Sequence, residues 1–430
     1  MKIAFHTLGC KVNQHDTQSI AGLFRAAGHQ TVPFEAGADV YVINTCAVTK
    51  VSEQKSRQII RKGIDYNPEA IVVVTGCYAQ TAPQEIAGLP GVNLVVGVAD
   101  RPKLVELVAE FSKNYRNQIK VTATQEIKGW QDIPVIDSLD RTRATLKVQD
   151  GCEQFCAYCI IPYARGKVRS MPIPQAIAAY SDLVSRGFRE IVLTGIHLGQ
   201  YGKDLGIQFH DLFAELLKID SNCRVRLGSL EPKDITPQLL ALVINNPKVC
   251  QHLHIPLQSG SDHILERMKR NYDLAYYGDL LTQIRKQNPL LSIGTDLIVG
   301  FPGESERDFE NTCSFLQAQN FSRVHVFRFS PRYGTPAASF PDRVAKGVQE
   351  ERSRAIQKIA DNSAGQYAGQ FTNRTVEVLF EEKVAGAWSG LSGEYLRVTI
   401  SAEHDLKNAL RMVRIQGQNN DSLIGSLIDS

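Results

Sequence analysis

The stretch GCEQFCAYCIIPYARGKVRS, residues 151–170, organises the rest of the chain. Its three cysteines, Cys152, Cys156 and Cys159, are separated by three and then by two residues. Three thiolates on one short loop can ligate three corners of an iron–sulfur cluster and leave the fourth iron open, whereas a structural zinc site closes with four ligands. A zinc knuckle completed by a distant residue remains the alternative. The spacing favours a cluster whose open iron can ligate a further molecule.

The composition is that of an ordinary globular protein with more than one domain. The chain has 430 residues, of which 43% are hydrophobic and 22% charged, with a formal net charge of +3. This length allows two or three domains. The apolar runs are too short for a membrane span, and the first residues lack the apolar core of a signal peptide. Nine cysteines in such a chain indicate metal binding or catalysis, so we expect a cytoplasmic protein without disulfides.

Residues 1–112 alternate short apolar strands with amphipathic helices, which predicts an open parallel α/β sheet. A cysteine follows each of three predicted strands. Cys10 follows the strand at 2–6, Cys46 the strand at 40–43, and Cys77 the strand at 71–74. The carboxyl ends of parallel strands share one edge of a sheet, where ligands bind, so these cysteines should converge. An isolated cysteine is usually a small buried hydrophobe. Three at equivalent strand ends instead predict a second three-thiolate cluster site.

A second α/β series begins near residue 142 and predicts an open, partial version of the eight-stranded barrel. Its six strands are expected at 144–148, 190–193, 225–227, 252–255, 292–299 and 324–327. The cysteine loop follows the first of them, at the end of the barrel where active sites form.

The remaining segments complete the expected domain organisation. Residues 113–140 are polar and lack periodicity, which is typical of an interdomain linker. The barrel domain is expected to span 141–370, ending in a charged amphipathic helix at 345–370. Residues 371–430 carry short alternating strands punctuated by glycines, which predicts a small antiparallel β-barrel. In the first domain, helices are expected at 17–27 and 52–64, the second with Ser52 as its N-cap.

These motifs together resemble the radical S-adenosylmethionine methylthiotransferase family over about residues 1–425. The matching segments are TLGCKVNQ at 7–14, INTCAVT at 43–49, TGCYAQ at 75–80 and GCEQFCAYCIIPYARG at 151–166. The segment GCKVNQ is similar to the corresponding segment in the branch of this family that modifies N6-threonylcarbamoyladenosine in tRNA. Residues 371–430 resemble the RNA-binding TRAM domain.

The resemblance implies an enzyme with two [4Fe–4S] clusters and S-adenosyl-L-methionine. Cys10, Cys46 and Cys77 would hold an auxiliary cluster that carries the sulfur to be inserted. Cys152, Cys156 and Cys159 would hold the cluster that cleaves S-adenosylmethionine to a radical, which takes hydrogen from C2 of the target adenine. The implied partners are the anticodon stem-loop of tRNA, an electron-donor protein and a sulfur source, with no membrane.

Further site residues are candidates only. Contacts with S-adenosylmethionine are implied for residues near the ends of the barrel strands, namely Tyr158, Thr194, Gly195, Glu231, Asp296 and Ile298. Each could instead shape a turn or a loop. A threonylcarbamoyl group ends in a carboxylate, which arginine binds in bidentate fashion, and the candidates are Arg165, Arg169 and Arg332. These arginines could equally hold structural carbonyls or tRNA phosphates.

Several residues carry no expected ligand role, and several functions stay open. His197, His252 and His254 are expected to be scaffold groups, and the other three cysteines to be ordinary buried thiols. Within the class, the substrate could be another tRNA adenosine, such as isopentenyladenosine, or a ribosomal protein aspartate. A cobalamin-dependent radical enzyme is disfavoured because residues 1–112 lack an Asp-x-His-x-x-Gly motif. A non-catalytic alternative is a metal-stabilised RNA-binding adaptor.

Overall fold

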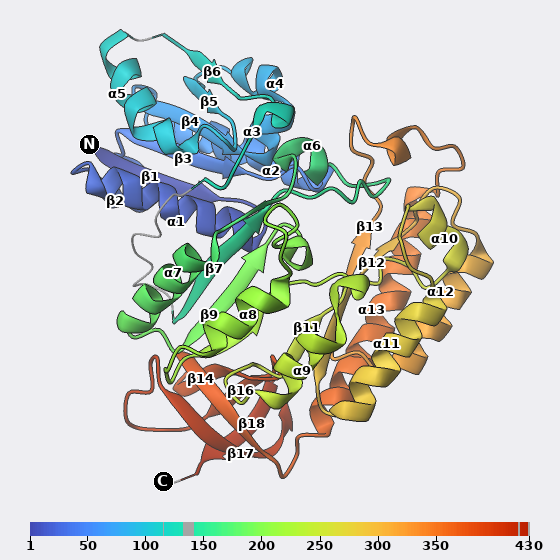
Figure 1. The fold of residues 1–430 in the computed structure, drawn as a ribbon. Helices are drawn as coiled ribbons and strands as arrows, with labels where there is room; N and C mark the ends of the chain where they lie inside the picture. Colours follow the sequence, from blue (N-terminus) through green and yellow to red (C-terminus); the bar gives the residue numbers. More distant parts are fainter. Residues whose placement is uncertain (115, 132–141, 420–421, 429–430) are drawn as a thin grey trace.

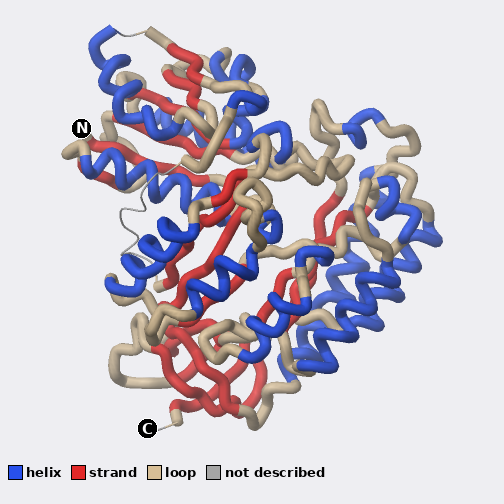
Figure 2. Tube along the Cα trace, viewed as in Figure 1, coloured by secondary structure: helices blue, strands red, loops and turns tan. Residues whose placement is uncertain are grey.

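The structure, a computed structural model, describes residues 1–114, 116–131, 142–419 and 422–428. An N-terminal sheet with its helices stands at one end of a partial barrel, and a small closed β-barrel lies at the other end (Figure 1). Helices cover the outer side of the barrel strands, as Figure 2 shows. No helix of the described residues has the length and apolarity needed to cross a membrane.

The N-terminal sheet has the order β2-β1-β3-β4-β5-β6, and every neighbouring pair is parallel. Its strands are β1 (Lys2–Thr7), β2 (Gln30–Val32), β3 (Val40–Thr45), β4 (Ile71–Gly76), β5 (Leu94–Val96) and β6 (Gln118–Lys120). The central strands β3 and β4 are buried along their whole length, which is why they read as continuous apolar runs. The predicted open parallel sheet is confirmed.

Helices cover both faces of this sheet. One face packs against α1 (Lys11–Ala26) and α5 (Leu104–Asn114), and the other against α2 (Lys50–Tyr66), α3 (Cys77–Thr81) and α4 (Pro83–Ala87). Both predicted helix starts are too late. α1 begins directly after Cys10, and the N-cap of α2 is Thr49 rather than Ser52, because the Thr49 hydroxyl accepts the Ser52 backbone N–H.

The segment 113–140 differs in part from the expected linker. α5 extends to Asn114, and Gln118–Lys120 add the edge strand β6 beside β5. A three-residue edge strand is too short to give a periodic signal in the sequence. Residues 132–141 lie outside the described part of the chain.

The barrel contains the six expected parallel strands, which are β7 (Arg143–Asp150), β9 (Glu190–Gly195), β10 (Arg224–Leu227), β11 (His252–His254), β12 (Ser292–Val299) and β13 (Arg323–Arg328). They form the sheets β10-β9-β7-β8 and β11-β12-β13, where β8 (Arg169–Ser170) is a short antiparallel addition. Parallel bridges from Val225 to Val249 and from Ser229 to His254 connect the two sheets. The barrel is therefore open between the β7 side and β13.

Helices follow the barrel strands, and all but the first of them pack against the strands in one large hydrophobic core. They are α6 (Ile161–Arg165), α7 (Ile173–Ser185), α8 (Phe209–Leu217), α9 (Pro237–Asn245), α10 (Asp262–Arg267), α11 (Leu274–Gln287), α12 (Glu306–Gln319) and α13 (Lys346–Gly369). The last helix matches the amphipathic helix expected at 345–370.

The C-terminal strands form a closed barrel in the order β14-β15-β16-β18-β17. They are β14 (Thr375–Val384), β15 (Ala387–Ser392), β16 (Arg397–Ile400), β17 (Leu410–Asn419) and β18 (Ser422–Leu427). The expected antiparallel pairing holds except between β16 and β18, which are parallel. The exception arises because the hairpin of β17 and β18 returns to β14 and places β18 beside a strand that is not its sequence neighbour.

A buried ion cluster joins this small barrel to the partial barrel. Glu190 at the start of β9 accepts from Arg224 at 2.7 Å and from Arg226 at 2.7 Å. Both arginines also donate to backbone carbonyls of the small barrel, Arg224 to Leu391 and Arg226 to Ser392. Burial raises the pKa of Glu190, but the two guanidiniums outweigh it and hold the pKa at about 2. The C-terminal barrel is thus fixed at the end of the partial barrel opposite the cysteine loop.

Candidate functional site

The three N-terminal cysteines lie at the carboxyl ends of three adjacent strands. β3 pairs with β1 on one side and β4 on the other; Cys46 and Cys77 directly follow β3 and β4, and Cys10 lies three residues after the end of β1. A Cβ placed on Gly9 would lie 3.0 Å from the Cys46 Sγ, so the backbone that carries Cys10 packs against Cys46. The structure therefore brings together the thiols that the sequence predicted to converge. Their ligation of a cluster stays a prediction.

Side-chain amides and hydroxyls hold the three strand ends together. The Asn13 amide donates to the carbonyls of Leu8, at 2.8 Å, and of Thr45, at 3.0 Å. The Thr45 hydroxyl donates to the Thr75 carbonyl at 2.6 Å, and the Asn44 amide donates to the Asn13 carbonyl at 2.9 Å. These bonds connect the start of α1 to Leu8 and to the end of β3, and the end of β3 to β4, so they fix the relative positions of the three cysteine-bearing loops.

The second cysteine set lies on the loop between β7 and α6, at the barrel end nearest the N-terminal sheet (Figure 1). The Cys159 N–H donates to the Cys156 carbonyl at 3.0 Å, which turns the loop back on itself. Arg270 donates to the Cys156 Sγ at 3.0 Å, and the His197 Nδ1 lies 3.5 Å from the Cys152 Sγ. The sequence reasoning missed Arg270, which follows α10 without a recognisable motif, and assigned His197 only a scaffold role.

Acidic residues orient these two cations. Arg270 forms an ion pair with Glu231, and the His197 Nε2 lies 2.7 Å from the Asp234 carboxylate. Burial lowers the pKa of His197, but its hydrogen bonds with Asp234 and Cys152 raise it to about 10. Protonated His197 and Arg270 thus place positive charge beside two of the thiols, an arrangement that suits thiolate ligands.

The helix α6 links the two cysteine sets. It begins two residues after Cys159, and at its other end the Arg165 Nε donates to the Cys77 Sγ at 3.4 Å. Ile160 and Ala164 pack in the same hydrophobic cluster as Cys77. A single short segment therefore carries one set and contacts the other, so both sets border the same region between the two domains.

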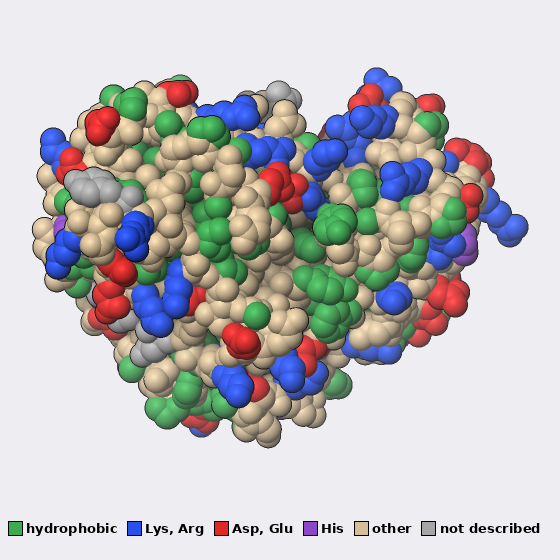
Figure 3. All heavy atoms as spheres, turned by 90° about the horizontal axis from the view of Figure 1, so that it is seen from above, with side chains coloured by type: hydrophobic (Ala, Val, Ile, Leu, Met, Phe, Trp, Pro, Cys, Tyr) green, Lys and Arg blue, Asp and Glu red, His purple; other side chains and the backbone are tan. Residues whose placement is uncertain are grey.

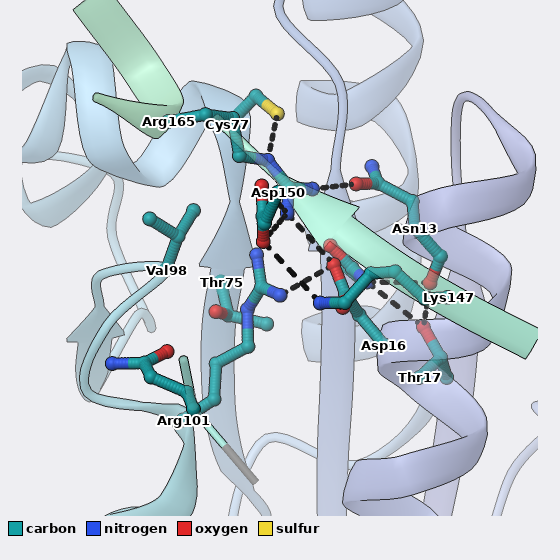
Figure 4. A network of polar contacts seen from close by, with 12 residues as sticks. Asn13, Asp16, Thr17, Thr75, Cys77, Val98, Arg101, Lys147, Asp150 and Arg165 are labelled. Carbon is teal, nitrogen blue, oxygen red and sulfur yellow. Dashed lines mark hydrogen bonds and ion pairs between the residues drawn. The ribbon is translucent and has the colours of Figure 1, made fainter. Parts of the chain in front are cut away.

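A buried network of ions lies next to Cys77 (Figure 4). It contains two carboxylates and four cations, which are Asp16, Asp150, Arg101, Lys147, Arg165 and Arg169. Asp16 lies 2.5 Å from Arg101, 2.6 Å from Lys147 and 3.0 Å from Arg165. Burial raises the pKa of both carboxyl groups, but the cations lower it further, so both are ionised. The excess of cations leaves net positive charge beside Cys77.

The three candidate carboxylate readers differ in their partners. Arg165 is fully buried and binds Asp16 and Asp150, while Arg169 donates to the backbone carbonyls of Arg165 and Lys167. Both have internal partners that account for their position. The substrate role predicted for Arg165, Arg169 and Arg332 stays a prediction for all three.

Arg332 differs from the other two in having buried donors without a partner among the described residues. It lies in the loop after β13 and forms an ion pair with Glu53 of α2, while its Nε and Nη1 are buried without a partner among the described residues. The same loop accepts the Lys50 backbone N–H at the Ser330 hydroxyl, at 3.0 Å. This loop therefore joins the barrel to the N-terminal domain beside the Cys46 segment.

The residues implied for S-adenosylmethionine lie on barrel strands or on the loops after them, around the barrel opening. Thr194 and Gly195 end β9, Glu231 pairs with Arg270, and Ile298 lies on β12. Tyr158 packs edge-on against Phe301 with a ring separation of 6.5 Å. Their role as cofactor contacts stays a prediction.

Asp296, the remaining candidate, lies between two histidines of neighbouring strands. One of its oxygens is 3.2 Å from His254 Nε2 and 3.1 Å from His325 Nδ1, and these hydrogen bonds outweigh burial and lower its pKa to about 2. The His254 ring also contacts the Ser229 hydroxyl at 2.8 Å. His254 therefore has internal partners, as expected of a scaffold group, and His252 stacks on Tyr395.

Exposed aromatic and aliphatic side chains border the cysteine loops. They are Val48 and Val51 of the N-terminal domain, Phe155 and Tyr163 of the cysteine loop and α6, and Tyr333 of the loop after β13. The Phe155 and Tyr163 rings pack edge to face at 5.6 Å, and Tyr333 is 97% exposed. The face in Figure 3 carries hydrophobic side chains near its centre with Lys and Arg side chains around them. Exposed rings of this kind suit stacking against planar ligands.

Family comparisons agree with this architecture. Residues 2–97 match the family described as uncharacterized protein family UPF0004, and residues 146–316 match the radical SAM superfamily. The chain is 41% identical to the threonylcarbamoyladenosine tRNA methylthiotransferase MtaB of Bacillus subtilis, over 96% of this chain and 93% of the relative. It is 33% identical to the tRNA-2-methylthio-N(6)-dimethylallyladenosine synthase of Moorella thermoacetica, over 98% of this chain and 97% of the relative.

Among solved structures, the radical S-adenosylmethionine methyltransferase TsrM from Kitasatospora setae, with cobalamin and a [4Fe–4S] cluster bound, is similar with a TM-score of 0.59. The two chains are 13% identical, and the match covers 78% of this chain and 77% of the other. At this identity the likeness shows a shared fold, with an α/β region and a radical SAM barrel, and nothing of the ligand.

Proposed function

The chain belongs to the radical S-adenosylmethionine methylthiotransferase family, and from this membership we propose that it methylthiolates C2 of N6-threonylcarbamoyladenosine in tRNA. Relatives named for this substrate are 33–42% identical over most of the chain. The relatives named for the dimethylallyl substrate are 33–35% identical. The substrate assignment rests on the three relatives of 36–42% identity, all of which are named for this substrate, and on the GCKVNQ segment.

One structural observation supports the chemistry above all others: two sets of three free cysteines lie on either side of α6. Neither set has a fourth cysteine, and each therefore suits a [4Fe–4S] cluster with one open iron. Positive charge from Arg165, His197 and Arg270 beside the thiols also suits anionic thiolate ligands. We propose that Cys152, Cys156 and Cys159 hold the radical-forming cluster and that the N-terminal set holds the auxiliary cluster.

With S-adenosyl-L-methionine, such clusters supply radical formation at one site and sulfur insertion at the other. The protein residues have the tasks of binding, orienting and excluding water. Arg270 and His197 hold two thiolates in place, and α6 fixes the separation of the two sets. The exposed rings of Phe155, Tyr163 and Tyr333 can stack on bases of a single-stranded anticodon loop.

The remaining partners follow from this function. The C-terminal barrel would act as a TRAM-like RNA-binding domain and bring the anticodon stem-loop to the barrel opening. Electrons would come from a donor protein and sulfur from a separate source, and the reaction would take place in the cytoplasm with tRNA. The two relatives described above are both named for a tRNA adenosine substrate, which favours this function over a ribosomal protein aspartate or a non-catalytic adaptor.

The test is a reconstituted reaction analysed by nucleoside mass spectrometry. Protein purified without oxygen is supplied with iron, sulfide, reductant and S-adenosylmethionine, and receives stem-loops carrying threonylcarbamoyladenosine, isopentenyladenosine or unmodified adenosine. We expect the methylthio product from the first RNA only. Product from the isopentenyl RNA alone would refute the substrate, and a protein that binds zinc without sulfide would refute the radical chemistry. The variant Cys223→Ala, which removes a buried thiol outside both sets, serves as the control.

A further inference from the structure

Lys11 is a cation without an acidic partner at the boundary of all three regions. It directly follows Cys10 and begins α1, and the structure gives it no ion pair or hydrogen bond within the described residues. Lys11 and Cys10 are both exposed, so the ammonium is accessible to a ligand bound beside Cys10.

Tyr395 of the C-terminal barrel is the group that Lys11 approaches. The Lys11 Nζ lies 6.0 Å from the centre of the Tyr395 ring, and the guanidinium carbons of Arg226 and Arg323 lie at 4.9 and 5.8 Å. The ring also stacks on His252 at 4.6 Å. Side chains from the N-terminal domain, from three barrel strands and from the C-terminal domain thus meet around one phenol.

The charges in this cluster do not cancel. Arg226 is compensated by Glu190, but Arg323, like Lys11, has no ion pair among the residues that the structure describes. Burial raises the pKa of Tyr395, yet the nearby cations, led by Lys11, outweigh burial and lower it. The phenol therefore lies in a net positive field, which attracts an anion.

A large cleft leads to this cluster from the open side of the barrel. It has a volume of about 980 Å³ and lies between β13, α13 and the C-terminal barrel. Arg323, Tyr395 and His325 line it, together with the exposed ring of Phe327. The cleft therefore makes the part of the cluster formed by Arg323 and Tyr395 accessible from solvent.

We propose that Lys11 binds the carboxylate of the threonylcarbamoyl group, and that Arg323 and Tyr395 complete the positively charged wall that receives it. This inference rests on the proposed function. In adenine, C2 and the carbon that bears N6 both flank N1, so the sulfur position and the substituent share one edge of the ring. If sulfur arrives from the side of Cys10, the substituent lies beside the residue next to Cys10. An ammonium provides the charge-assisted partner that a carboxylate requires.

The experiment measures equilibrium binding of three anticodon stem-loops to the cluster-containing protein without reductant. The RNAs carry threonylcarbamoyladenosine, its carboxyl methyl ester or unmodified adenosine at the same position. We expect Lys11→Gln to weaken binding of the first RNA about tenfold to hundredfold and to leave the other two unchanged. Arg323→Gln is expected to act in the same direction with a smaller effect, because its charge lies in the outer part of the cleft.

The matched controls are Lys55→Gln on the exposed face of α2 and Arg328→Gln on the same strand as Arg323. Iron content is compared for every variant, since Lys11 neighbours Cys10. Equal weakening of all three RNAs by Lys11→Gln would mean that the lysine contacts a phosphate and would overturn the inference, as would no weakening. If the unaltered protein methylthiolates threonylcarbamoyladenosine and Lys11→Gln keeps its preference, only this inference fails. If the unaltered protein does not modify that RNA, the proposed function fails first.

Discussion

The two cysteine sets reach similar arrangements by different routes. Cys152, Cys156 and Cys159 lie on one loop, so their proximity follows from chain connectivity. Cys10, Cys46 and Cys77 come from three separate strand ends, and their proximity depends on the register of β1, β3 and β4 and on the amide and hydroxyl bonds between the loops. A local set tolerates distant changes in the fold, whereas a set assembled by a sheet requires the sheet.

The charged residues around the two cysteine sets also differ, because those around one set are separate pairs and those beside the other form one network. The barrel set meets two separate cations, Arg270 and His197, each oriented by one carboxylate. The N-terminal set borders a connected buried network whose members come from both domains. The network thus makes the N-terminal set the part of the site that depends most on how the two domains fit together.

Removal of a single cysteine should give the largest functional difference between the two cysteine sets. We expect Cys156→Ala to abolish both cleavage of S-adenosylmethionine and formation of the methylthio product. Cys46→Ala should abolish the product but keep the cleavage, because the radical-forming set is intact. Each variant should lose about half of the iron and sulfide, since each set is expected to hold one cluster. Measurement of 5′-deoxyadenosine and of the modified nucleoside checks this, and loss of cleavage in Cys46→Ala would contradict the division of roles.

The buried network should make the N-terminal side sensitive to the loss of one charge. Asp16→Asn leaves Arg101, Lys147 and Arg165 without their shared carboxylate and should lower the free energy of unfolding by about 3–5 kcal/mol. Chemical denaturation of the cluster-free protein measures it. The control is Asp182→Asn, an exposed partner of Arg186 on α7, for which a change below about 1 kcal/mol is expected. Equal effects of the two substitutions would show that the buried network stabilises the fold no more than an exposed ion pair does.

Both sets contain a Gly-Cys pair for the same steric reason. Gly76 and Gly151 have φ values of 98° and 79°, and an added Cβ would overlap the carbonyl oxygens of Thr45 and Lys167. Alanine at either position should cost about 3 kcal/mol through strain and overlap together. Gly187→Ala, where φ is 86° and the space is open, should cost about 1 kcal/mol from strain alone. Denaturation midpoints of the three variants would show whether overlap or strain dominates.

Protonation of His15 should give an effect that is small near pH 6 and grows as the pH falls, and it should act on the N-terminal side. His15 is buried without hydrogen-bond partners among the described residues, and burial first, then Lys147, lowers its pKa to about 3. The unfolded chain therefore binds a proton that the folded chain does not, and stability falls as pH decreases from about 6.5 toward 3, by at most about 1.4 kcal/mol per pH unit. His15→Met should flatten the dependence of the unfolding free energy between pH 6.5 and 4. An unchanged slope would contradict the assignment.

Much of the site was readable from the sequence because its signals are local or periodic. The spacing of Cys152, Cys156 and Cys159 indicates a cluster loop directly, and the alternation of strands and helices predicts both sheets. Cys10, Cys46 and Cys77 could be grouped because parallel strands end at one edge. Helix starts and β6 were misjudged, because a cap or a three-residue edge strand depends on contacts that no period reveals.

The sequence by itself determined the order of the elements, the two cysteine sets and the family. Only the tertiary structure decided what surrounds them. Arg270 reaches Cys156 from a loop after α10, and Arg165 is held by Asp16 and Asp150. Lys11 faces Tyr395 from a domain at the opposite end of the chain. Such contacts join residues far apart in sequence, and their geometry is set by the packing of three domains, so no local pattern could have predicted them.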